Sequence, residues 1–200
     1  MANLSNKLSQ IHITTGSGKM SEIPSINTSS LTNHFCRSLA DKPDLVCFKC
    51  YSDRLSKLRP SLEKRLLQNS VLLSQKLIPL TELPVLNARF ARFSSFGEII
   101  NETHFENFIN IARRNPYTTF GLWTKRSDIV MKYPKEPNIK YIFSVAKVDG
   151  GKPNDSILKY FDKTFTAVSK TKPANCAGSC INCLLCYTDN DVTDIREIIK

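Results

Sequence analysis

Short strand-like runs that alternate with helix-like stretches are the feature that most constrains the fold of this chain. About four or five strands are predicted, because apolar, β-branched and aromatic residues cluster in brief runs. These runs are residues 23–27, 87–93, 118–124, 141–146 and 163–168. Strand, helix and strand in succession predict right-handed βαβ units and therefore an α/β fold on a parallel sheet. Two forms fit this pattern: a partial (half) TIM-like barrel, or an open sheet.

Two helices are predicted between these strands. Leucines recur every three or four residues from Leu55 to Leu66, and Pro60 between them either kinks this helix or begins a new one. A capping-box pattern at residues 103–106 predicts the start of a second helix. That helix should end at Asn115, because a proline follows.

The length of 200 residues favours one main domain. We expect a flexible arm or short edge strand at residues 1–22, an α/β domain at 23–170 and a cysteine-rich segment at 171–200. No stretch approaches the ~18 apolar residues of a membrane span, so no membrane partner is expected. The first residues contain no apolar signal region, which favours the cytoplasm.

The cysteines form two groups, and their spacing is typical of metal ligands. The first group follows the first predicted strand and the second is near the C-terminus; they are Cys36, Cys47 and Cys50, and Cys176, Cys180, Cys183 and Cys186. In a reducing compartment such thiols favour a metal over disulfides. Short intervals of this kind hold iron–sulfur clusters, so one or two four-iron clusters are expected. Four cysteines can saturate a cluster, whereas three leave one iron open for a substrate or cofactor.

Zinc is the alternative metal. The pairs Cys47/Cys50 and Cys183/Cys186 could close one tetrahedral site with four thiolate ligands. Iron–sulfur is favoured because the zinc site would leave two cysteines of the C-terminal group without a role. Ten residues separate Cys36 from Cys47, and Cys36 is either a third ligand or a buried thiol.

The carboxyl ends of the strands are where chemistry is expected in a parallel α/β fold. Glu98 follows the second predicted strand, where it could pair with the amino group of a methionine-type cofactor or favour the start of a helix. Ser95, from the same loop, is the second expected cofactor-binding residue. Arg92, on that strand, could hold a phosphate or carboxylate, so Glu98 and Arg92 are the candidate catalytic residues.

The formal net charge of +10 favours an anionic partner, and nucleic acid is the commonest. Interleaved basic and aromatic residues are the candidates for such an interface: Arg89, Arg92, Trp123, Lys125 and Arg126. The alternative is a solvated basic surface with Trp123 in the core.

Three motifs together resemble the phage gene product 88 family, which occurs in bacteriophages, plasmids and bacterial genomes. They are C-x2-C-Y at residues 47–51, R-F-x-S-F-G-E at 92–98 and C-x2-C-x2-C-Y at 180–187, and the resemblance extends from about residue 20 onward. More distantly, the chain is similar to radical S-adenosylmethionine enzymes. Those enzymes usually carry C-x3-C-x2-C with an aromatic residue before the last cysteine, whereas here Lys49 precedes Cys50.

The resemblance implies a phage or mobile-element iron–sulfur protein. As an enzyme it would cleave S-adenosylmethionine reductively and modify a nucleic acid or a protein. Two alternatives are a non-catalytic nucleic-acid-binding protein stabilised by zinc or a cluster, and a protein that binds a host factor.

Overall fold

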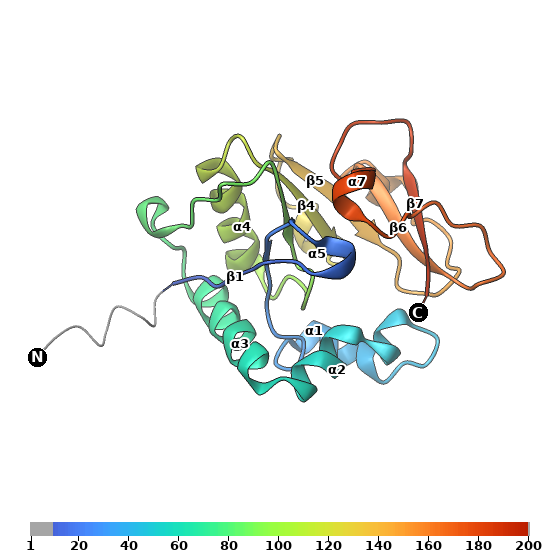
Figure 1. The fold of residues 1–200 in the computed structure, drawn as a ribbon, viewed down its shortest axis with the longest axis horizontal. Helices are drawn as coiled ribbons and strands as arrows, with labels where there is room; N and C mark the ends of the chain where they lie inside the picture. Colours follow the sequence, from blue (N-terminus) through green and yellow to red (C-terminus); the bar gives the residue numbers. More distant parts are fainter. Residues whose placement is uncertain (1–9, 200) are drawn as a thin grey trace, which may run out of the picture.

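The computed structural model describes residues 10–199, and Figure 1 shows its fold. The part of the predicted N-terminal arm up to residue 9 lies outside the described residues. The strands are β1 (Ile13–Thr14), β2 (Ser25–Ile26), β3 (Phe90–Phe93), β4 (Thr119–Thr124), β5 (Ile139–Ser144), β6 (Lys163–Val168) and β7 (Asp194–Ile198). The helices are α1 (His34–Ala40), α2 (Tyr51–Leu58), α3 (Pro60–Gln75), α4 (Glu102–Arg114), α5 (Ser127–Val130), α6 (Asp155–Leu158) and α7 (Cys180–Cys183). Short 3-10 turns are η2 (Gly18–Met20), η3 (Val46–Lys49) and η4 (Leu80–Glu82).

The described strands form one sheet in which they lie side by side in chain order, from β1 to β7. Only the β1–β2 pair is antiparallel, and each strand from β3 to β7 is parallel to the one before it. The predicted α/β fold with a parallel sheet is therefore confirmed. The sheet has seven strands rather than four or five.

The additional C-terminal strand is β7, which lies in the cysteine-rich segment, where the sequence predicts no strand. Charged residues alternate with isoleucines in β7, so it lacks the continuous apolar run of a buried strand. Its pairing with β6, from Thr164 opposite Asp194 to Val168 opposite Ile198, makes it a strand. Pairing with an existing strand outweighs the weak local preference of the segment.

Both faces of the sheet are covered, as expected for parallel strands. On one face, Phe93 of β3 stacks on Phe120 of β4 at 4.4 Å and on Phe108 of α4 at 4.1 Å. Figure 1 shows α3 and α4 side by side on this part of the molecule. The opposite face carries a second buried cluster, formed by Phe90, Trp123, Ile142 and Tyr187 with Ile23. The C-terminal segment that contains α7 packs against this second cluster.

The helix boundaries follow local signals. Pro60 starts α3, so the prediction of a new helix at this proline is correct. The predicted capping box at residues 103–106 is wrong, because Asn101 caps α4 by accepting a hydrogen bond from the backbone N–H of His104 at 2.9 Å. The helix ends at Arg114, directly before Asn115, as predicted.

His104 gives the fold a testable dependence on pH. Its ring is fully buried, its Nδ1 accepts from the backbone N–H of Ile100 at 3.1 Å, and it packs on Phe108. Burial lowers the pKa of His104 to about 3. The unfolded chain binds this proton near its ordinary pKa of about 6.5. The His104 contribution to the free energy of unfolding should therefore fall by about 1.4 kcal/mol per pH unit as the pH drops from about 6.5 to about 3.

Denaturant unfolding at several pH values, for the wild type and His104→Gln, measures this contribution. The variant should show a shallower loss of stability between pH 6 and pH 4 than the wild type. Equal slopes in the two proteins would contradict a buried neutral imidazole at this position.

Candidate functional site

The first cysteine group lies at the carboxyl edge of the parallel sheet. Cys36 is in α1, Cys47 is in η3 and Cys50 directly precedes α2, all in the connection that follows β2. Glu98 follows β3, and Lys125 follows β4. The carboxyl ends of β2, β3 and β4 meet at one edge because these strands are parallel neighbours. The thiol of Cys36 accordingly lies within electrostatic range of Glu98, Lys125 and both other cysteines.

Local structure explains how this edge is assembled. Asn33 caps α1 by accepting from the backbone N–H of Cys36 at 3.3 Å, and its amide donates to the Glu98 carbonyl at 2.8 Å. Gly97 has a positive φ of 71°, and a Cβ there would lie 2.5 Å from the carbonyl oxygen of Thr28. Only glycine lets the loop after β3 approach the chain after β2 so closely.

Glu98 is a buried carboxylate that joins the ends of two strands. It is 6% exposed, and its carboxylate accepts from the Thr124 hydroxyl at 2.6 Å and from the backbone N–H of Lys125 at 2.9 Å. The backbone N–H of Ile99 also donates to it at 3.0 Å. These bonds fix the carboxylate, so Glu98 has a positioning role in addition to any binding role.

Two thiols of this group are in surroundings that oppose their ionisation. Burial raises the pKa of Cys36 and of Cys47, and Lys125 is the nearby charge that opposes the increase. Within the described part of the chain all seven cysteines are free of disulfides. In residues 10–199 no group of three or more histidine, cysteine or acidic residues is already arranged to hold a metal ion.

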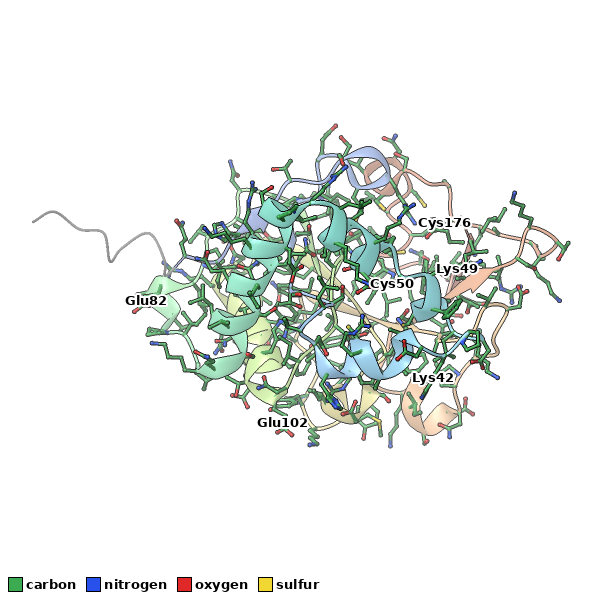
Figure 2. All side chains as sticks on the ribbon, turned by 90° about the horizontal axis from the view of Figure 1, so that it is seen from below. Lys42, Lys49, Cys50, Glu82, Glu102 and Cys176 are labelled. Carbon is green, nitrogen blue, oxygen red and sulfur yellow. The ribbon has the colours of Figure 1, made fainter. Side chains whose placement is uncertain are left out.

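The C-terminal cysteine group is attached to the sheet at two places. The backbone N–H of Cys176 donates to the Arg196 carbonyl of β7 at 3.0 Å. Tyr187 follows the last cysteine and is 2% exposed; its ring packs on Phe90 at 5.6 Å and on Trp123 at 5.7 Å. Figure 2 labels Cys176 and Cys50, which in this view lie in the same part of the molecule, away from Glu82.

Gly121 makes room for this attachment. A Cβ at Gly121 would lie 2.5 Å from the Trp123 ring and 2.9 Å from the Tyr187 ring. The absence of a side chain on β4 therefore allows both rings to cover the sheet. Aromatic packing therefore holds the C-terminal segment over this face of the sheet.

Arg92 lies between the two cysteine groups. Its guanidinium is 3.9 Å above the Trp123 ring, and Nη1 donates to the sulfur of Met20 at 3.5 Å. Its Nε is buried and has no acceptor among the described residues. The Arg92 charge interacts electrostatically with the Tyr51 hydroxyl, and also with the thiols of Cys180 and Cys186.

The residues predicted to bind nucleic acid are divided between the surface and the interior. Arg89 is exposed, whereas Trp123 is 7% exposed and packs against Arg92. Arg126 is partly buried and donates to backbone carbonyls. Lys125 is directed to the first cysteine group and donates to a serine hydroxyl at 3.2 Å. Ser95 lies nearby, and its hydroxyl donates to Met20 at 3.6 Å.

Sequence reasoning missed the two tyrosines of the site. Tyr51 follows Cys50 and Tyr187 follows Cys186, so each cysteine group ends in the same Cys-Tyr pair. The Tyr51 hydroxyl donates to the Ser95 carbonyl, and both tyrosine hydroxyls lie within range of the Arg92 charge. Burial raises the pKa of both phenols. The repeated pair was the signal that could have identified them.

Lys19 was also missed. It ends a Gly-Ser-Gly-Lys segment that does not match a phosphate loop, because Met20 stands where that motif needs Ser or Thr. In the structure η2 packs beside α7, and Lys19 pairs with Glu197 at 2.6 Å. Its ammonium group also interacts with Cys176. The segment thus belongs to the surroundings of the second cysteine group.

The fold and this edge define an α/β protein with two cysteine groups gathered around a parallel sheet. The family model described as Gene product 88 matches residues 3–196, and the chain belongs to this family. The predicted resemblance to this family is confirmed, whereas the more distant resemblance to radical S-adenosylmethionine enzymes is not supported by these comparisons. Comparison with curated proteins and with solved structures found no match. No helix within residues 10–199 is both long and apolar enough to cross a membrane.

Proposed function

We propose that this protein is a phage or mobile-element iron–sulfur protein with chemistry like that of radical S-adenosylmethionine enzymes. The observation that carries the proposal is the position of Cys36, Cys47, Cys50 and Glu98 at the carboxyl edge of adjacent parallel strands. Active sites of parallel α/β proteins are built from the loops at this edge. In the proposal, the three cysteines hold a cluster with one open iron, and the C-terminal group holds a second cluster.

The strand order supports a partial barrel as the scaffold. From β2 to β7 each strand is the parallel neighbour of the one before it, with no reversal of direction along the sheet. Doubly wound sheets reverse their strand order at a switch point, whereas barrels add strands in sequence. In this proposal the face with Arg92, Trp123 and Tyr187 is the inner face of a half barrel, which the C-terminal segment covers.

The donor set fits an iron–sulfur cluster. The thiols are soft ligands that are partly buried, and burial raises the pKa of Cys36 and Cys47, so a bound metal centre would convert them to thiolates. Two buried donors near the second group, Arg92 Nε and the Tyr187 hydroxyl, have no acceptor among the described residues. Loading would draw the cysteines of each group together.

The residues of the chain then have distinct roles. A cluster with one open iron supplies a coordination site and an electron for reductive cleavage of S-adenosylmethionine. Glu98 is held by Thr124 and the Lys125 backbone, and it would accept from the amino group of a bound cofactor, to which Ser95 would add a hydrogen bond. Arg92 supplies positive charge for an anionic group. The substrate in this proposal is a nucleic acid or a protein.

Metal analysis after anaerobic purification and reconstitution tests the proposal. The expected protein is brown and contains about eight irons if both groups hold four-iron clusters. With dithionite it should convert S-adenosylmethionine to methionine and 5′-deoxyadenosine. A colourless protein with one tightly bound zinc would contradict the proposal and favour a zinc site made of Cys47, Cys50, Cys183 and Cys186. A protein with full iron content that does not cleave S-adenosylmethionine would contradict only the proposed enzymatic activity.

A further inference from the structure

Arg92 is a partly buried cation whose charge has no counter-ion among the described residues. Lys19, another cation beside the C-terminal cysteines, is paired with Glu197 at 2.6 Å. Arg92 has no carboxylate within ion-pair distance among residues 10–199, and its Nη1 contacts only the weakly accepting sulfur of Met20. A guanidinium that is partly removed from water and left unpaired costs free energy. This position therefore favours an anion.

The Tyr187 hydroxyl is a second hydrogen-bond donor that lacks a partner among the described residues. It is buried without an acceptor among the described residues, although buried tyrosine hydroxyls usually find one. Tyr187 and Arg92 both pack on Trp123, the former at 5.7 Å between ring centroids and the latter at 3.9 Å. Two unpaired donors thus flank one aromatic ring on the inner face of the sheet.

Two of the C-terminal cysteines lie within electrostatic range of both donors. Cys180 and Cys186 pack against the cluster that contains Trp123 and Tyr187. The charge of Arg92 reaches both thiols. An anionic centre held by this cysteine group would therefore lie near Arg92 Nε and the Tyr187 hydroxyl, two donors that have no acceptor among the described residues.

We propose that Arg92 and Tyr187 are positioning residues that stabilise the reduced form of the C-terminal cluster, and that this cluster carries electrons instead of serving only as a structural clamp. The inference rests on the proposed function. The cluster takes one electron from a one-electron donor, no covalent bond of the protein forms or breaks, and its net charge becomes more negative by one. Positive charge and hydrogen bonds to cluster sulfurs raise the reduction potential.

A redox titration with dithionite, followed by electron paramagnetic resonance, tests this proposal. The parent is the full chain with Cys36, Cys47 and Cys50 replaced by serine, which retains only the C-terminal cysteine group. In that parent, Arg92→Gln should lower the midpoint potential, Arg92→Lys should lower it less, and Tyr187→Phe should also lower it. Arg89→Gln is the matched control, because it removes an exposed charge just before the same strand, and it should leave the potential unchanged.

A second readout uses the metal-free protein. Tyr187→Phe removes a buried hydroxyl without an acceptor, so it should raise the unfolding midpoint of the apo-protein while lowering the potential of the loaded one. A purely structural role for Tyr187 predicts no change in potential. If Arg92→Gln does not fold, Arg92→Lys and Tyr187→Phe decide the question.

The outcomes separate the two proposals. If the parent binds iron and the Arg92 and Tyr187 variants have the same midpoint potential as the parent, this inference is overturned. The proposed iron–sulfur site is then unaffected. A parent that binds no iron removes the C-terminal cluster from the proposed function, and this inference fails with it.

Discussion

Replacing Cys47 and Cys50 together by serine should remove about four of the roughly eight irons and abolish S-adenosylmethionine cleavage. Both residues are only partly buried, and they lie in a surface connection outside the sheet. The stability of the metal-free variant should therefore change by less than about 1 kcal/mol. Iron content, product formation and denaturant unfolding measure the three effects on one preparation.

The matched variant replaces Cys183 and Cys186 by serine. It should also lose about half of the iron, but with a loss of stability in the reconstituted protein of about 2 kcal/mol or more, because the proposed second cluster would help to hold the segment that carries Tyr187 onto the sheet. If the Cys183/Cys186 variant lost S-adenosylmethionine cleavage and the Cys47/Cys50 variant kept it, the open iron would have to be assigned to the C-terminal group instead of the first group.

Replacing Glu98 should have the second large effect, a loss of folding stability. Glu98→Leu should destabilise the protein by about 3 kcal/mol or more, because it leaves the Thr124 hydroxyl and two backbone N–H groups without their acceptor. Glu98→Gln keeps one carbonyl oxygen and should cost about half as much. Denaturant unfolding at neutral pH measures both changes.

Glu102→Gln is the control for the removed charge. Glu102 is 51% exposed and pairs with Lys132 at the surface, so the change should cost less than about 0.5 kcal/mol. Glu98→Gln also separates the structural role of the carboxylate from its proposed binding role. If Glu98 binds the amino group of a cofactor, the variant should bind that cofactor more weakly than the wild type at temperatures where both proteins are folded. Equal stability of Glu98→Leu and Glu102→Gln would contradict the structural role.

The regular elements were predictable where the local pattern was strong. The predicted strands at 118–124 and 163–168 differ from β4 and β6 by at most one residue at each end, because β-branched and aromatic residues fill both runs. The strand predicted at 87–93 is shorter in the structure, where β3 begins at Phe90. The capping residue of α4 was misassigned because Asn101 and Thr103 both fit a helix start, and only the hydrogen bond selects Asn101.

The candidate site was predictable in its parts but not in its arrangement. The cysteine spacing and the R-F-x-S-F-G-E motif identify Cys47, Cys50, Arg92 and Glu98 as residues of interest. The sequence does not show that Glu98 is held by Thr124 of the next strand, because that contact depends on strand adjacency.

The sequence alone determined the family, the parallel α/β class and the two cysteine groups, because each is encoded in local spacing or in short-range periodicity. Only the tertiary structure decided that Arg92 lies between groups separated by more than a hundred residues. It also decided that Tyr187 covers the sheet where Gly121 leaves space. The physical reason is that parallel strands bring distant segments to one edge and one face, and no local pattern encodes which side chains meet there.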